Sequence, residues 1–238
     1  MKISLVIQGP LTHLTFEIVK KARLSNYIGV IIISTWKNDP LEIETLLSSY
    51  PDLIILRLNE YSARWSKFNI DKQAYSTKCG LDYVTTEYAI KLRSNWPYLK
   101  FDKICEKFLE SPEKILSSNI FFRPHRIHPF HCSDHLLVAK TEVLKTAFRG
   151  VVDRCERNDI HREYFAMPDP AVEQVICDEL LKAMNIQERN IEIMKSSFEI
   201  VKLEEVIEIE HVNEADRWIF STETHHVRCN VASSVDEI

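Results

Sequence analysis

Apolar runs alternate with amphipathic runs through the first 95 residues of the chain. The apolar runs are rich in Val and Ile, which is typical of strands, and the runs between them repeat apolar residues at helical spacing. The elements expected in this half are strands at 2–9, 27–36, 52–58 and 87–93, and helices at 12–24, 40–50 and 66–84. Strands this apolar need cover on both faces. The pattern therefore predicts an α/β fold, with a doubly wound, mostly parallel sheet between two layers of helices.

The pattern is looser after residue 95. Helices are expected at 101–111, 141–148 and 169–184, and strands at 119–124, 133–140 and 206–212. A loop rich in proline and histidine covers 123–135. Because no repeat, low-complexity linker or clear shift of composition marks a boundary, residues 1–238 are expected to form a single domain.

Composition and charge narrow the classes of function. The chain is 45% hydrophobic and 27% charged, which is ordinary for a soluble globular protein. A net charge of −5 supplies no basic field for a phosphate backbone, so nucleic acid is not an expected partner. No stretch approaches the roughly 18 apolar residues of a membrane span, and the first residues turn polar too early for a signal peptide. We therefore expect a cytoplasmic protein, whose six scattered cysteines stay reduced and mostly fill the core.

Polar, aromatic and cationic residues directly follow the strands of the first half. In an open parallel sheet, ligands bind at the carboxyl ends of the strands. The residues in these places are Gln8, Gly9, Pro10, Ser34, Thr35, Trp36, Asn59, Glu60, Arg93, Ser94 and Asn95. The chain lacks the dinucleotide fingerprint, the phosphate loop and the serine-hydrolase elbow. An aromatic face beside cations suits a nucleotide sugar, whose base stacks and whose diphosphate is held by Lys, Arg or a metal.

Each of these residues also has a purely structural interpretation. Lys91 and Arg93, near the end of the strand EYAIKLR, would simply be solvated if that strand lay at a sheet edge. The apolar residues before them favour a central strand and a functional role. Gly9 is explained nearly as well by a strand-ending turn. For Trp36, the residues alone favour packing in the core over stacking on a base.

Six sequence blocks carry a family resemblance. They are ISLVIQGP, IIISTWK, NIDKQAYSTKCGL, YAIKLRSN, SDHLLVAKTEVL and VEQVICDELL. In this order they resemble the WavE family of lipopolysaccharide-synthesis glycosyltransferases, over roughly residues 3–183. The resemblance implies a GT-A-like fold and transfer of a hexosyl group from a nucleotide-sugar donor to a glycan or lipid-linked glycan, with work at the inner face of a membrane as a further expectation. It implies a nucleotide-binding half at 1–95, and an acceptor half with a C-terminal extension at 96–238.

The helix at 66–84 gains a role from the resemblance. Asn69, Lys72, Gln73 and Ser76 recur three and four residues apart, which places them on one polar face. Such a face is ordinarily just solvated. The resemblance implies that it lines the donor site.

The metal ligand is where the chain departs from the family. GT-A enzymes commonly hold Mn²⁺ or Mg²⁺ with a DxD-type carboxylate, and WavE-like sequences usually read KLRSD where this chain reads KLRSN. Asn95 is therefore the candidate metal ligand, although its amide oxygen adds no charge. Two interpretations stay open, a weakened metal site or electrostatic replacement of the metal by Lys91 and Arg93.

Two carboxylates are candidates for catalysis. Asp134 precedes an apolar strand and Glu173 lies at the start of a helix, where either could take the proton of an acceptor hydroxyl. Asp134 could instead bind the donor sugar. The structural alternatives are a turn residue for Asp134 and a favourable helix-dipole contact for Glu173.

The loop between His125 and Asp134 is expected to meet the acceptor. His125, His128 and His131 recur at intervals of three, but the prolines among them prevent the regular helix that would put them on one face. Contacts with sugar hydroxyls are therefore favoured over a zinc site.

Two other functions compete with sugar transfer. A nucleotidyltransferase uses a related sheet, but it normally needs a Gly-rich and basic first loop that QGPLTH lacks. A GT-A-like binding protein without catalysis is the second alternative, and the neutral Asn95 favours it. The sequence does not indicate an oligomeric state.

Overall fold

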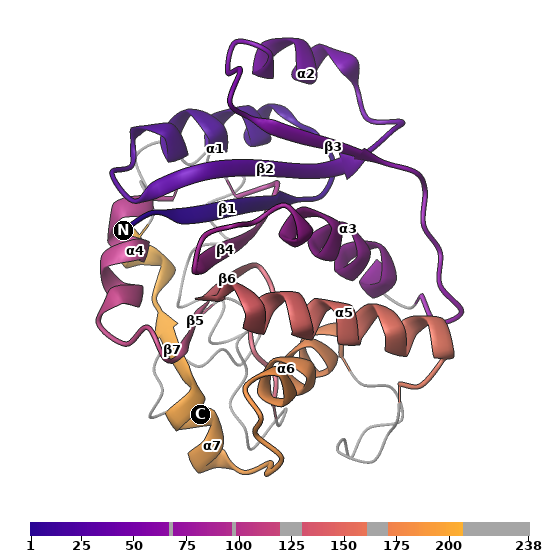
Figure 1. Cartoon of the computed structure of the whole chain (residues 1–238), viewed down its shortest axis with the longest axis vertical. Coiled ribbons are helices and arrows are strands. Elements are labelled where there is room, and N and C mark those ends of the chain that lie inside the picture. Colours follow the sequence, from indigo (N-terminus) through magenta and orange to yellow (C-terminus); the bar gives the residue numbers. More distant parts are fainter. Residues whose placement is uncertain (67–68, 97–98, 120–129, 161–170, 207–238) are drawn as a thin grey trace.

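Strands of the described chain form one sheet, in the spatial order β3-β2-β1-β4-β6-β5-β7 (Figure 1). The computed structural model describes residues 1–66, 69–96, 99–119, 130–160 and 171–206. The strands are β1 (Ile3–Gln8), β2 (Ile28–Trp36), β3 (Ile54–Leu58), β4 (Tyr88–Arg93), β5 (Ile115–Ser118), β6 (Leu136–Lys140) and β7 (Phe198–Val201). β6 runs antiparallel to β4 and β5, and the other neighbouring pairs are parallel. The mostly parallel sheet expected from the sequence is confirmed.

Helices cover both faces of this sheet (Figure 1). They are α1 (His13–Leu24), α2 (Leu41–Leu47), α3 (Ile70–Asp82), α4 (Phe101–Leu109), α5 (Thr141–Arg157), α6 (Val172–Ala183), α7 (Ile191–Ser197) and α8 (Leu203–Val206). β1 is buried along its whole length, with Val6 packed towards α3, α5 and α6, and Leu5 and Ile7 packed towards α1, α2 and α4. This double burial explains why β1 is apolar at consecutive positions instead of alternating.

The second half differs from the expected elements. The strand expected at 119–124 is replaced by β5, which ends at Ser118, while 120–124 lie outside the described residues. β5 is inconspicuous in the sequence because Ser117 and Ser118 are buried in it, where their hydroxyls bond to Ser133. β7 was not expected. Of the strand expected at 206–212, Val206 lies in α8 and the rest falls outside the described part of the chain.

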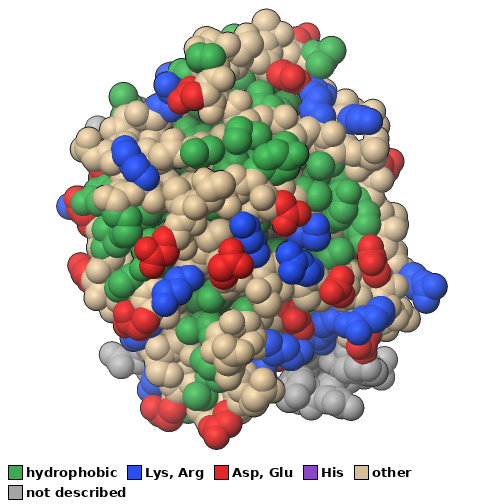
Figure 2. Space-filling view, in the orientation of Figure 1, with side chains coloured by type: hydrophobic (Ala, Val, Ile, Leu, Met, Phe, Trp, Pro, Cys, Tyr) green, Lys and Arg blue, Asp and Glu red, His purple; other side chains and the backbone are tan. Residues whose placement is uncertain are grey.

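The cysteines in the described ranges are free thiols, as expected, and Cys229 lies outside those ranges. Among the same residues, no helix has both the length and the apolar character that crossing a membrane requires. Figure 2 shows acidic and basic side chains interspersed over one face of the molecule, which fits the modest net charge.

Candidate functional site

The carboxyl ends of β1, β2 and β4 lie side by side. Gln8 pairs in register with Ser34 on one side and with Arg93 on the other, so the sheet brings together three of the expected site residues. Gln8 and Ser34 are buried, and their side-chain oxygens have no hydrogen-bond partner within the part of the chain that the structure describes. Buried polar atoms normally find a partner. These two oxygens are therefore unsatisfied polar atoms buried at the carboxyl ends of β1 and β2.

Gly9 allows the turns after β1 and β4 to pack against each other. Its φ of 125° lies in a region that residues with a side chain rarely adopt. A Cβ atom on Gly9 would lie 2.7 Å from the Ser94 hydroxyl oxygen. The backbone N–H of Ser94 donates to the Gln8 carbonyl at 2.9 Å, and that of Gly9 to the Ser34 carbonyl at 3.2 Å. Gly9 is thus required by both conformation and space, while Pro10 is exposed beside it.

Asp39, which was not expected at the site, holds two of its turns. Its carboxylate accepts hydrogen bonds from the backbone N–H of Leu11 at 3.0 Å and of Trp36 at 3.2 Å, and from the Thr35 hydroxyl. The buried Thr35 therefore has a structural partner, and the half-buried Trp36 is fixed at its backbone. An Asp before a proline just past a strand is the sequence signal that marks this turn.

Lys91 lies inside the protein and not at the surface of the strand ends. Its side chain is 0% exposed, and its ammonium donates to the backbone carbonyl of Asp134 and lies 3.7 Å from the Asp134 carboxylate. The ammonium also lies 5.9 Å from the centre of the Phe148 ring. Burial lowers the pKa of Lys91 to about 8, despite the opposing effect of Asp134. Lys91 can therefore act on a ligand only through its charge or through Asp134.

Asp134 is locked into a buried network. Its side chain is 2% exposed, and Oδ2 accepts a hydrogen bond from the Gln73 amide. Burial is the largest single influence and pushes the pKa of Asp134 upward, but the charges of Lys91, His135 and Arg93 and a backbone hydrogen bond together leave that pKa below its ordinary value. A carboxylate with a lowered pKa is a weak base. The environment of Asp134 thus suits a positioning role better than proton abstraction.

The side chains of Arg93 and His135 contact each other next to the network of Lys91, Asp134 and Gln73. Nη1 of Arg93 lies 3.2 Å from Nε2 of His135, and the two residues are also joined by a hydrogen bond from the Arg93 N–H to the His135 carbonyl at 3.1 Å. Because a guanidinium has donors only, Nε2 can accept from Arg93 when it carries no proton, and the same Nε2 lies 3.7 Å from Asp134 Oδ1. Trp96 packs edge-on against His135 at a centroid distance of 5.0 Å. His135 was not among the expected site residues, and it orients the half-buried guanidinium of Arg93.

Glu173 is the more accessible of the two candidate catalytic carboxylates. It lies in the first turn of α6, its side chain is 20% exposed, and its Oε2 lies 3.5 Å from Nε2 of the buried His131. The Cys132 thiol contacts its backbone carbonyl at 3.8 Å. Residues 131–135 thus connect Glu173 to Asp134 and Arg93. His125 and His128, also expected in this loop, lie outside the described residues.

The four expected residues of α3 divide into different environments. Gln73 reaches Asp134, whereas Ser76 is buried and donates to the Gln73 carbonyl at 3.2 Å. Lys72 pairs with Glu60 at 3.1 Å, and Asn69 is exposed at the start of the helix with a positive φ of 58°. Only Gln73 of the four contacts the network.

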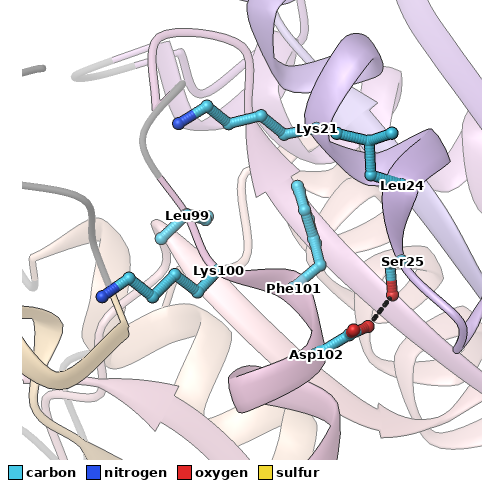
Figure 3. A pocket seen from close by; sticks show the side chains of 7 residues that line it. All are labelled: Lys21, Leu24, Ser25, Leu99, Lys100, Phe101 and Asp102. Atoms are coloured by element: carbon cyan, nitrogen blue, oxygen red, sulfur yellow. Dashed lines mark hydrogen bonds between the residues drawn. The ribbon is translucent and has the colours of Figure 1, made fainter.

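The structure also contains a hollow of about 200 Å³ that none of the expected site residues line (Figure 3). Its walls come from the end of α1 and the start of α4, and they include Lys21, Leu24, Lys100 and Phe101. Asp102 accepts a hydrogen bond from the Ser25 hydroxyl at one side of the hollow (Figure 3). Since the end of α1 leads into the first residue of β2, this hollow lies away from the carboxyl ends of the strands.

The sequence matches a known family over most of its length. The family described as WavE lipopolysaccharide synthesis matches residues 3–204. The chain belongs to the WavE family. This confirms the expected resemblance, and the sheet of this WavE protein is the mostly parallel α/β sheet, with helices on both faces, that the sequence predicts. No curated protein sequence matches the chain.

Some solved structures resemble this WavE protein weakly. S. aureus TarS, residues 1–349, has a TM-score of 0.48 at 12% identity, over 96% of this chain and 73% of that one. The 4-diphosphocytidyl-2C-methyl-D-erythritol synthase of Anaerococcus prevotii has a TM-score of 0.47 at 11% identity, over 84% and 86%. A putative glucose-1-phosphate thymidylyltransferase of Bacillus anthracis has a TM-score of 0.47 at 9% identity, over 76% and 84%. Likenesses this weak carry no functional argument.

Proposed function

We propose that this chain is a glycosyltransferase that moves a hexosyl group from a nucleotide-sugar donor to a glycan or lipid-linked glycan during lipopolysaccharide or surface polysaccharide synthesis. Membership of the WavE family supports the biological setting. The observation that carries the proposal is the meeting of three strand ends. It places two buried polar atoms, of Gln8 and Ser34, that lack a hydrogen-bond partner among the described residues beside Arg93 at the end of β4. In the proposed arrangement residues 1–95 hold the donor, and the acceptor approaches from the half that begins at 96.

The residues present divide the work of an inverting transfer between them. The nucleoside lies along the turns at Gln8 to Pro10 and Ser34 to Trp36, where Trp36 offers an aromatic face. An acceptor oxygen attacks the anomeric carbon, a new C–O bond forms, and the bond to the diphosphate breaks with its electron pair leaving on the diphosphate. Glu173 takes the proton of the attacking hydroxyl. His131, 3.5 Å away, positions the Glu173 carboxylate.

Product analysis tests this function. The enzyme is incubated with UDP-, GDP-, CDP- and dTDP-hexoses, and release of nucleoside diphosphate is measured with water in place of the unidentified acceptor. In a parallel reaction it receives nucleoside triphosphates with hexose 1-phosphates, and release of pyrophosphate is measured. We expect nucleoside diphosphate from one of the donors. Pyrophosphate release instead would establish a nucleotidyltransferase, and binding without turnover would indicate a binding protein.

Glu173 is tested with a matched control. Glu173→Gln should lower kcat about 100-fold or more, with KM for the donor nearly unchanged, because the variant keeps its shape and loses the base. Glu142→Gln is the control, since Glu142 occupies the first turn of α5 and its side chain is 84% exposed. Equal activity of the two variants would remove Glu173 from the reaction.

A further inference from the structure

The end of β4 is poorly suited to a divalent metal. Mn²⁺ and Mg²⁺ prefer oxygen ligands, usually with one or more carboxylates. Asn95 offers a neutral amide and is exposed, while the Asp134 carboxylate is buried beside Lys91 and bound by Gln73. The Asp39 carboxylate is occupied by the hydrogen bonds of two turns. Within the ranges that the structure describes, no group of three or more His, Cys, Asp or Glu side chains could hold a metal ion. The described residues around the end of β4 therefore do not fit the divalent metal that the family resemblance implies.

The end of β4 carries positively charged side chains in place of a metal-binding carboxylate. Arg93 is the last residue of β4, directly beside Gln8 in the sheet, and its guanidinium is held at Nη1 by His135. Lys91 lies two residues earlier in the same strand, and its charge is turned inward to Asp134. Arg93, which is half-buried, is therefore the cation of β4 that a ligand at the strand ends can touch. A guanidinium held on one side keeps its remaining N–H groups free to bind a phosphate in a bidentate manner.

We propose that Arg93, oriented by His135, binds the donor diphosphate directly and that sugar transfer in this protein needs no divalent metal. The inference rests on the proposed function and adds to it the means of diphosphate recognition. When the bond between the anomeric carbon and the diphosphate breaks, negative charge grows on the leaving phosphate oxygen. Arg93 stabilises that charge by charge-assisted hydrogen bonds, which is the task that a metal performs in enzymes with a carboxylate motif.

Binding measurements test the proposal without requiring the acceptor. UDP, GDP, CDP, dTDP and inorganic pyrophosphate are titrated into the full chain by calorimetry, once with EDTA and once with Mn²⁺. We expect the tightest nucleotide to bind with the same Kd, within about threefold, in both conditions. Arg93→Met should raise the Kd of that nucleotide and of pyrophosphate about 10- to 100-fold, which is the usual range for losing a hydrogen bond to a charged group. Binding of the matching nucleoside monophosphate should be weakened less by Arg93→Met, because this ligand lacks the second phosphate.

Further variants separate a specific contact from a loss of charge or of fold. Lys103→Met removes one positive charge from an exposed position on α4 and should leave binding unchanged. His135→Leu should weaken pyrophosphate binding, and His135→Gln should restore most of it, because a Gln oxygen can again accept from Arg93. This rescue would not occur if His135 only filled space. If Arg93→Met fails to fold, Arg93→Lys replaces it, with a smaller loss expected from its single point charge.

The outcomes distinguish this proposal from the proposed function. A Kd at least about tenfold lower with Mn²⁺ than with EDTA would overturn the metal-free mechanism and leave the glycosyltransferase standing. Unchanged pyrophosphate binding by the folded Arg93 variants would also overturn it. Absence of any nucleotide binding under both conditions would refute the proposed function itself. Asn95→Asp adds a final check. If Mn²⁺ speeds turnover by this variant but not by the wild type, the result supports a wild-type site that works without the metal.

Discussion

Replacing Lys91 with Met should strongly destabilise the protein, because Asp134 would keep its charge and lose its counterion. Both side chains are essentially inaccessible, at 0% and 2% exposed, and their charged atoms lie 3.7 Å apart. At an effective dielectric constant of about 20, this separation corresponds to an attraction of about 4.5 kcal/mol. Breaking such a buried pair from one side typically costs about 3–5 kcal/mol. We expect Lys91→Met to lower the free energy of unfolding by this amount.

The pair itself adds little net stability. Lowering the pKa of Lys91 from 10.5 to about 8 means that burial of its charge costs about 3 kcal/mol even beside Asp134. The double variant Lys91→Met with Asp134→Asn should therefore unfold with a free energy within about 1 kcal/mol of the wild type, since both charges are gone and Gln73 keeps an acceptor. Urea denaturation at neutral pH, read by circular dichroism, measures all four proteins of this cycle. If the double variant loses as much free energy of unfolding as the two single variants together, the two charges are not coupled, which would contradict this prediction.

The same variants predict a pH dependence of definite sign. In the wild type, the lowered pKa of Asp134 contributes stability that is present above about pH 4 and is lost as the pH falls through the lowered value. In Lys91→Met, burial without the cation raises the pKa of Asp134, so the variant loses stability as the pH rises from about 4. The deficit of the variant relative to the wild type should therefore shrink towards acid pH. A deficit that does not change with pH would contradict the assignment of charge to Asp134.

The turns that follow β1 and β2 give further predictions. Gly9→Ala should destabilise the protein by about 1–3 kcal/mol and weaken nucleotide binding, because the new Cβ meets both a φ of 125° and the Ser94 hydroxyl; an unchanged melting temperature would contradict this. Asp39→Ala should cost about 2–4 kcal/mol in urea denaturation, since two backbone N–H groups and the Thr35 hydroxyl lose their acceptor, whereas Asp39→Asn should cost less because it retains one acceptor oxygen. Equal losses for the two Asp39 variants would contradict the acceptor role.

Much of the candidate site can be predicted from the sequence, because parallel strands end at the same edge of a sheet. That rule alone brings Gln8, Ser34 and Arg93 together, and the structure shows them in register. Glycine after a strand likewise indicates a turn, although only the structure shows that Ser94 fills the space where a Cβ would lie.

The interior of the site could not be predicted, because it depends on contacts between distant residues. Alternation along β4 puts Lys91 and Arg93 on the same face, so their different environments come from β6, whose antiparallel course brings Asp134 over Lys91. Charged residues in a sequence are usually assigned to the surface, and full burial of a lysine becomes visible only once its partner is located. The contacts of Asp39 and His135 likewise join segments that no sequence periodicity links.

Hydrogen–deuterium exchange with a saturating nucleoside diphosphate tests whether the donor binds at the carboxyl ends of β1, β2 and β4. The experiment compares the free protein with the protein bound to the tightest of UDP, GDP, CDP and dTDP. We expect slower exchange in peptides that cover 8–11, 34–39 and 93–96, at the carboxyl ends of β1, β2 and β4. Protection confined to peptides around 21–25 and 99–102, which line the separate hollow, would contradict the assignment of the donor site to the sheet edge.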